Sequence, residues 1–341
     1  MTGHLSAAAS HGPYVSDTLG RMTLTRLLVL ALPGIFILGA AACGDSKDGS
    51  QVSGGGASAQ GGASSTGGLI ILPEAGNGFL GDGGDGRGGP APGMLPAGFT
   101  KADVGGYKLG EPITDDSGSG AGGASNSDGQ GCGTVILAVI RDFTPDHPDF
   151  EKAVAAEKGL VKSKLGADRK PVFAHTDATA TVSGPKSFDQ WYRNVKGVNL
   201  PFVLDVFFAP ENGTTSFQSR AFFPLDGAGF GNQGNPHNFH FTTEIHTQFR
   251  YNGKEVFNFT GDDDVWIFIN NFLVVDLGGV HGAQTAQLDV DAIAKDAGIE
   301  VGSVYPFDMF QAERHTTESN FRADTNLEFV DCGTIVPDVP K

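Results

Sequence analysis

The feature that most constrains the fold is a series of short apolar or alternating runs separated by Gly, Asn and Asp. They include "CGTVILAVIRDF" (132–143), "PFVLDVFFAP" (201–210), "FHFTTEIHTQFR" (239–250), "VWIFI" (265–269) and "FLVVDL" (272–277). Short runs rich in β-branched and aromatic residues, bounded by turn residues, are typical of β-strands. Many such strands with a few short helices predict an antiparallel β-sandwich over residues 132–334, followed by a tail at 335–341.

Two local patterns add detail to this fold. The stretch "DFEKAVAAEKGLVKSKLG" (149–166) lies between Pro148 and a terminal glycine, and it places its apolar residues at helical spacings. It therefore predicts a helix. The stretch "YNGK" (251–254) predicts a β-hairpin, because Asn-Gly accepts the positive φ angles of a type I′ turn.

The N-terminus is typical of an export signal. Arg21 and Arg26 precede the apolar run "LLVLALPGIFILGAAAC" (27–43), which ends in small residues. The ending "LGAAAC" resembles a bacterial lipoprotein signal, in which the cysteine is lipidated after cleavage. We therefore expect residues 1–43 to be a signal, Cys43 to carry the lipid, and the protein to be held at the cell envelope or outer surface through that lipid alone. Secretion without an anchor and a retained membrane anchor are the alternatives.

Residues 44–131 are mostly Gly, Ser, Ala and Asp, as in "GGGASAQGGASSTGG". Such a composition buries too little apolar surface to offset chain entropy, so it predicts a disordered, flexible linker. The whole chain has a formal net charge of -16. A nucleic-acid partner is therefore not expected, since phosphates require clustered Lys and Arg. Calcium, which binds hard oxygen ligands, suits such a chain better.

Cys132 and Cys332 stand at the two ends of the predicted sandwich. In an exported chain, a pair of cysteines placed in this way predicts a disulfide. Two free buried thiols are the alternative.

Three consecutive aspartates, Asp262, Asp263 and Asp264, directly precede the strand-like run "VWIFI". Neighbouring carboxylates repel one another, and a calcium ion would neutralise them. Successive side chains of a strand point to opposite faces, so two adjacent aspartates can share one ion only if the backbone between them is distorted. The alternative is that these aspartates cap a turn by accepting hydrogen bonds from nearby amides.

The stretches "FRYNGKEVFNFTGDDDVWIFINNFLVVDLGGVHGA" and "YPFDMFQAERHTTESNFRADTNL" resemble the fibro-slime family, a group of bacterial and amoebal extracellular domains. That family is similar to the protective-antigen-type lectin sandwich, and the resemblance extends over residues 132–332. It implies a calcium ion held by two consecutive aspartates joined by a cis peptide, together with an asparagine, with sugar hydroxyls on the ion. These ligands fall on Asp262, Asp263 and Asn320. Asp264 falls where many relatives have Gly, and it is a further candidate for ligand binding.

Other residues are candidates for the same site. His281, on the Gly-rich loop "GGVHGA", would line it or simply be solvated. Trp191 would stack on a sugar ring or pack in the core, whereas Trp266 is expected in the core. Arg314 and His315 would form an ion-pair network with Glu313 and Glu318 that supports the loop carrying Asn320.

A zinc site at the remaining histidines is not expected. His240 and His246 would share one face of a strand, but at strand rise they would be about 20 Å apart.

The chain contains no G-x-S-x-G, H-E-x-x-H or phosphate-loop motif, so we do not expect an enzyme. The preferred interpretation is a calcium-dependent module for carbohydrate binding or adhesion, with a glycan or an extracellular matrix polysaccharide as partner. One alternative is a matrix protein with a purely structural calcium. Another is a glycoside hydrolase that pairs the aspartates with Glu244 or Glu313.

Overall fold

The computed structural model describes residues 94–114 and 134–336, all of which belong to one compact unit, Gly81–Lys341. The predicted signal with Cys43, most of the predicted linker, and Cys132 lie outside the described residues. Within the described part of the chain, no helix is long and apolar enough to cross a membrane.

The larger sheet is antiparallel and contains nine strands among the described residues. Its order is β1 (Thr100–Lys101), β2 (Gly106–Pro112), β5 (Leu200–Phe207), β3 (Val135–Asp142), β8 (Phe241–Arg250), β14 (Val304–Glu313), β10 (Asp264–Ile269) and β11 (Phe272–Leu277). The ninth strand, β16 (Glu328–Asp331), pairs with β8.

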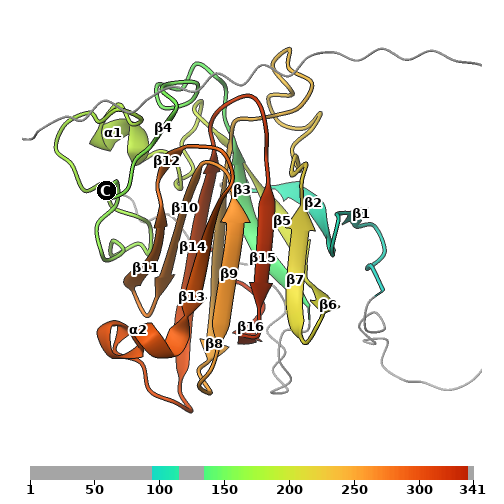
Figure 1. The fold of residues 1–341 in the computed structure, drawn as a ribbon. Helices are drawn as coiled ribbons and strands as arrows, with labels where there is room; N and C mark the ends of the chain where they lie inside the picture. Colours follow the sequence, from blue (N-terminus) through green and yellow to red (C-terminus); the bar gives the residue numbers. More distant parts are fainter. Residues whose placement is uncertain (1–93, 115–133, 337–341) are drawn as a thin grey trace, which may run out of the picture. The chain divides into compact units, whose positions relative to one another are not determined.

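The second sheet is antiparallel as well, with the order β13 (Gln284–Asp289), β9 (Val256–Gly261), β15 (Phe321–Thr325), β7 (Thr214–Ser219) and β6 (Ala209–Glu211). Its alternate side chains, such as Phe257, Phe259 and Phe321, are buried in one core with Phe241 and Ile245 of the larger sheet. Two antiparallel sheets that share a core in this way form a β-sandwich (Figure 1), as the sequence predicted.

The opposite face of the larger sheet is also buried. Residues 143–199, which we call the covering segment, connect β3 to its neighbour β5 and contain only β4 (Ala155–Ala156) and α1 (Pro185–Phe188). Aromatic and aliphatic side chains of this segment form a second apolar cluster with Trp266 and Phe268 of β10 and with Phe310 of β14. The larger sheet is therefore buried on both faces, which explains why β10 is apolar without interruption from Val265 to Ile269.

The helix predicted at 149–166 is wrong. This stretch is irregular apart from β4, and Val154 is 67% exposed. Tertiary contacts override the helical spacing, because Glu151 has a φ of 53° and its amide donates to the carbonyl of Arg314. The longest described helix is instead α2 (Val290–Ala297), which Asp289 caps at its N-terminus and left-handed Gly298 caps at its C-terminus.

The hairpin predicted at 251–254 is also wrong. This turn joins β8 of the larger sheet to β9 of the second sheet, and the two strands do not pair. Gly253 and Lys254 have φ angles of 89° and 72°, whereas Asn252 does not have a positive φ. The turn residues were recognised correctly, but they form a connection between the two sheets.

The predicted boundary between linker and sandwich needs correction. Residues 100–112, assigned to the linker, form β1 and β2, and β2 pairs with β5. The sandwich therefore begins before Cys132. The short stretch "GYKLGEP" of β2 was missed because it stands among Gly-rich sequence.

Candidate functional site

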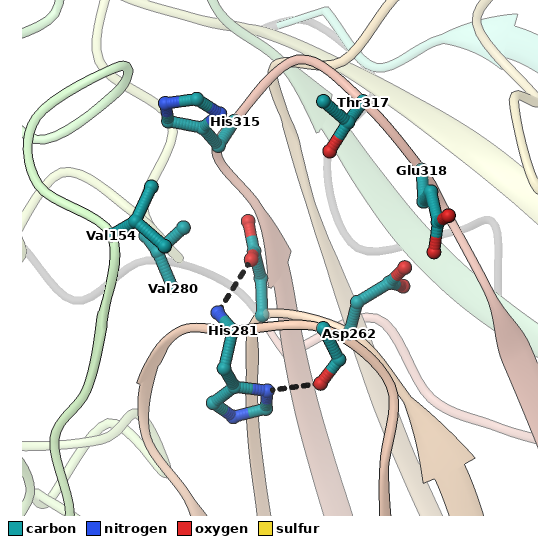
Figure 2. A pocket seen from close by; sticks show the side chains of 9 residues that line it. Val154, Asp262, Val280, His281, His315, Thr317 and Glu318 are labelled. Carbon is teal, nitrogen blue, oxygen red and sulfur yellow. Dashed lines mark hydrogen bonds between the residues drawn. The ribbon is translucent and has the colours of Figure 1, made fainter. Parts of the chain in front are cut away.

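A small cavity of about 80 Å³ lies where several loops meet at one end of the sandwich. Asp262 and Asp263 line it from the connection between β9 and β10, and His281 lines it from the loop after β12 (Gly279–Val280). The connection between β14 and β15 contributes His315, Thr317 and Glu318, and Val154 comes from the covering segment (Figure 2). We call this the acid cavity, because its charged lining residues among the described part of the chain are carboxylates.

The Asp262 carboxylate is buried and is bound by a single neighbour. The backbone amide of Asn320 donates to Oδ1 at 2.6 Å, and Nδ2 of Asn320 donates to Oδ2 at 2.9 Å. Burial nevertheless raises the pKa of Asp262 above its ordinary value. The sequence-based pairing of Asp262 with Asn320 is thus present in the structure.

Asp263 is held by two backbone amides. Its Oδ1 accepts from the amide of His281 at 3.2 Å, and its Oδ2 accepts from the amide of Arg314 at 2.8 Å. Burial raises the pKa of Asp263 to about 7, although the charge of Arg314 opposes the shift. Its φ of 54° is in the left-handed region, which a non-glycine residue rarely adopts. The backbone is therefore distorted at the aspartate pair, as two adjacent aspartates on one site require.

Asp264 points away from the acid cavity and is fully buried. Its Oδ1 accepts from the amide of Gly279 at 2.6 Å, and its Oδ2 forms an ion pair with Nε of Arg314 at 2.6 Å. A Cβ at Gly279, which has a φ of 97°, would come within 2.2 Å of the carbonyl oxygen of Ala155, so only glycine fits there. Asp264 therefore positions the loop that carries His281, and the prediction that it binds a ligand is wrong.

Arg314 is likewise a positioning residue. Its guanidinium is fully buried, donates to the carbonyls of Asp149 and Thr181, and stacks on Trp191 at 4.6 Å. Arg314 does not line the acid cavity, and of the two alternatives for Trp191 the structure shows core packing. Trp191 is 0% exposed and donates to the carboxylate of Asp149. Trp266 is fully buried as well, as expected.

The two histidines at the acid cavity have different partners. The carbonyl of His281 accepts from the amide of Asp263, the amide of His281 donates to Oδ1 of Asp263, and Nδ1 of His281 lies 3.0 Å from the carbonyl oxygen of Gly282. His315 lies at the rim with Nε2 3.3 Å from Glu151, which also contacts His240. The predicted network around Arg314 and His315 therefore exists, but its carboxylates are Asp264 and Glu151 and not Glu313 and Glu318.

Glu313 is buried behind the site, on β14. Burial, with the charges of Asp263 and Asp262, raises its pKa well above its ordinary value, and Oε2 has no hydrogen-bond partner. Ionising the three buried carboxylates of Asp262, Asp263 and Glu313 together would destabilise the fold unless a counter-ion were bound.

The donor set suits a calcium ion. Asp262 and Asp263 each accept one hydrogen bond per oxygen, which leaves carboxylate lone pairs free for a cation. Nowhere in residues 94–114 and 134–336 do three His, Cys, Asp or Glu side chains form a metal-binding cluster. Calcium would thus rely on two carboxylates with amide and carbonyl oxygens. Asn320 would have to turn its amide, since its nitrogen now faces Asp262.

Sequence reasoning missed a second group of buried charges, on the face of the larger sheet under the covering segment. Glu244 is bound by Arg141 at 2.6 Å, by Lys170 and by His246. Burial alone would raise the pKa of Glu244, but the charges of Lys170, Arg141 and His246 outweigh burial and hold it well below its ordinary value. His246 also contacts Asp308 at 2.5 Å. No pattern in the sequence links these distant residues.

These contacts bear on two alternatives from the sequence. The histidines considered for zinc have separate partners, because His237 contacts Asp226 at 2.6 Å and His240 contacts Glu151. Glu244 is fully buried and its carboxylate contacts the charged side chains of Arg141 and Lys170, so it is not available to a substrate.

Cys332 is half-buried and has no disulfide partner among the described residues. Its carbonyl accepts from the amide of Leu137 at 2.8 Å, so it lies beside β3, the first strand after Cys132. Because Cys132 lies outside the described residues, the disulfide stays a prediction.

Comparisons with known proteins agree with this architecture. Residues 230–340 match the model of the PA14 domain. This match supports the protective-antigen-type sandwich, and the matched residues include Asp262, Asp263 and Asn320. The fibro-slime part of the resemblance stays a prediction.

The chain is also similar to proteins of Dictyostelium discoideum. It is 43% identical to protein psiR over 215 residues, which is 57% of this chain and 21% of psiR. It is 39% identical to protein psiD over 221 residues, which is 60% of this chain and 43% of psiD. The chain thus spans less than half the length of these relatives.

Among solved structures, the PA14 domain of the MpAFP antifreeze protein matches 59% of this chain and 91% of that domain, with 9% identity and a TM-score of 0.27. A β-glucosidase from Kluyveromyces marxianus in complex with glucose matches 61% of this chain and 18% of the enzyme, with 12% identity and a TM-score of 0.25.

Proposed function

We propose that the chain is a non-catalytic, calcium-dependent module that binds carbohydrate at the cell surface or in an extracellular matrix. The observation that carries this proposal is that Asp262 and Asp263, both buried, line the acid cavity side by side, and that Asn320 donates to Asp262. PA14 domains occur in adhesins and glycosidases and bind carbohydrates, which supports a glycan as the partner.

Calcium would be held by Asp262 and Asp263, and it would supply coordination positions that accept hydroxyl oxygens of a sugar. The chain's own residues prepare this site. The amides of His281 and Arg314 orient Asp263, and Asn320 orients Asp262. Desolvation of these carboxylates is costly, and the ion would offset that cost.

A ligand-binding role suits the geometry better than a purely structural ion does. The acid cavity opens beside exposed Val154 and Glu318, so a ligand can approach the aspartates from outside. A structural calcium would be enclosed by protein. The hydrolase considered from the sequence would pair the aspartates with Glu244 or Glu313, and neither of these two carboxylates is accessible.

Calorimetry with calcium, followed by a glycan array with and without a chelator, tests the proposal. We expect calcium to bind at or below millimolar concentration and glycan binding to be lost on chelation. Asp262→Ala should weaken both, whereas Asp226→Ala, at an exposed aspartate outside the cavity, should weaken neither. Sugar binding that survives chelation would refute the metal-mediated mechanism. Release of new reducing ends would instead support the hydrolase.

We further propose that the module is exported and attached by lipid at Cys43. The Gly-rich residues that follow would let it reach ligands away from the membrane. Mass spectrometry of the mature protein should find a modified Cys43 at the N-terminus, and a chain that still begins at Met1 or Met22 would contradict this.

A further inference from the structure

A second cavity, larger than the acid cavity, lies between the N-terminal strands and the end of β7. It is open to solvent, has a volume of about 370 Å³, and is lined by residues that include Lys101, Asp103, Tyr107, Ser219, Arg220 and Ala221. We call it the Tyr107 cavity. Paired backbone hydrogen bonds of 3.0 Å between Val104 and Gln218 fix the N-terminal strands to β7, so its two walls are held together.

The lining of the Tyr107 cavity is suited to hydroxyl groups. Arg220 donates to the carboxylate of Asp103 from its backbone amide at 2.8 Å and from Nη2 at 2.9 Å, yet its side chain is 74% exposed. A guanidinium has five N–H donors and a carboxylate about four acceptor positions, so the pair keeps donors and acceptors for a ligand. Tyr107 is half-buried and packs edge-to-face on Phe222 at 5.6 Å, which fixes its ring. A fixed aromatic ring beside spare donors and acceptors is suited to a sugar.

The strand register places the two cavities side by side. Phe321 of β15 is the register partner of Gly261 in β9 and of Ser219 in β7. Because neighbouring strands are about 4.8 Å apart, Gly261 and Ser219 are about 10 Å apart. The next residue beyond this row is Asp262 on one side and Arg220 on the other.

Asn320 lies between Asp262 and Arg220, because β15 lies between β9 and β7. It precedes Phe321 and donates to Asp262. Its neighbour Ser319 exchanges hydrogen bonds of 2.9 and 2.8 Å with Phe222, two residues after Arg220. The end of the second sheet at which β9 and β7 finish and β15 begins therefore forms one continuous rim from the acid cavity to the Tyr107 cavity. Figure 1 shows β2 beside the same end of β7.

We propose that the Tyr107 cavity is a second subsite for the same glycan, so that the protein binds an oligosaccharide along this rim in preference to a single sugar. This inference rests on the proposed function. The acid cavity would hold one sugar, and Tyr107 with the Arg220–Asp103 pair would hold a later sugar of the same chain.

The test uses the whole chain with calcium and linear oligosaccharides of increasing length, from monomer to hexamer, derived from glucan, mannan, galactan and chitin. For the series that binds, affinity should rise roughly tenfold between the monomer and the longer members, which corresponds to about 1.4 kcal/mol. Ala221→Trp, which fills the cavity from an exposed position, should remove this gain and leave monomer and calcium binding unchanged. Ala292→Trp, at an exposed position on α2, is the matched control and should change nothing. Arg220→Ala should reduce the gain without adding bulk.

Equal affinity for monomer and hexamer, with calcium dependence intact, would overturn the second subsite and leave the proposed function standing. Ala221→Trp with wild-type affinity for the hexamer would do the same. Failure of every series to bind, or binding that survives chelation, would overturn both proposals.

Discussion

Arg314 and Asp264 form an ion pair of 2.6 Å between two side chains that are both completely inaccessible to solvent. The same guanidinium donates to two carbonyls of the covering segment and stacks on Trp191, while the backbone amide of Arg314 donates to Asp263. One residue thus joins the larger sheet, the covering segment and the acid cavity.

Arg314→Lys should therefore destabilise the protein strongly, because an ammonium cannot reproduce the planar set of donors that Arg314 uses. We expect a loss of about 1–3 kcal/mol in the free energy of unfolding for each buried carbonyl that is left without its donor. Denaturant unfolding measures it. Arg250→Lys is the control, since Arg250 and Glu328 are 3.7 Å apart and exposed, and the change there should stay below about 1 kcal/mol. Equal losses of unfolding free energy in the two variants would show that the buried contacts of Arg314 stabilise the protein no more than the exposed contact of Arg250 does.

The pKa of Asp263 predicts how the stability of the metal-free protein depends on pH. Burial raises this pKa from 3.8 to about 7, so between these values the folded state binds more protons than the unfolded state. The contribution of Asp263 to stability therefore falls as pH rises from about 4 to about 7. Because calcium requires the carboxylate form, stabilisation by calcium should grow over the same range.

Thermal unfolding at pH 5 and pH 7.5, in chelator and in calcium, measures this dependence. Asp263→Asn should lose the calcium response and reduce the pH dependence, because the amide does not titrate in this range. Burial raises the pKa of Asp142 to about 6, so Asp142 changes stability in the same range, and the difference between wild type and variant is the quantity to compare. A difference that is constant with pH would contradict the prediction.

Glu244 and Lys170 form the centre of the buried charges under the covering segment. Glu244→Gln would remove the carboxylate charge that Arg141, Lys170 and His246 contact in the interior, and we expect a loss of about 3–5 kcal/mol. Lys170→Met should also destabilise, and the double variant should lose less than the sum of the two single changes because the partners are coupled. Urea unfolding of the four proteins measures the coupling, and strict additivity would show that the contact contributes nothing.

The cysteine pair gives a chemical test of how the sandwich closes. Since Cys332 lies beside β3, a non-reducing digest of the exported protein should contain a peptide pair linked through Cys132 and Cys332. Closing a loop of about 200 residues contributes roughly 4–5 kcal/mol in the chain-entropy model, so reduction should lower the melting temperature. Free alkylation of both thiols in the folded protein would refute the bridge.

Local patterns in the sequence were sufficient for most strands, because each strand of a sandwich keeps its own alternation of buried and exposed side chains. The run 132–143 contains β3, and "VWIFI" forms most of β10. Patterns failed where tertiary contacts decide the backbone. Phe150 is buried and Val154 is exposed, so the helical spacing of the stretch 149–166 does not correspond to one buried face.

The proximity of Asp262, Asp263 and Asn320 could be predicted because their motifs resemble a known family, whereas their role as calcium ligands stays a prediction. The role of Asp264 and the actual ion-pair partners of Arg314 could not be predicted in this way, and the sequence left two roles open for Trp191. The identity of a charged or aromatic residue near a site does not show whether its side chain faces the ligand or holds the loop. Only the packing in the folded protein distinguishes these roles. Residues of the Tyr107 cavity come from segments more than a hundred positions apart, so no local pattern marks them.

The pairing of β2 with β5 has a consequence for solubility. Without β2, β5 would become the outermost strand of the larger sheet, with the unpaired backbone groups of "LPFVLDVF" exposed to other molecules. An uncovered apolar edge of this kind recruits strands from neighbouring chains. A fragment cut at Cys132 would therefore be prone to aggregate, whereas one that begins before Thr100 would keep its own protective strand.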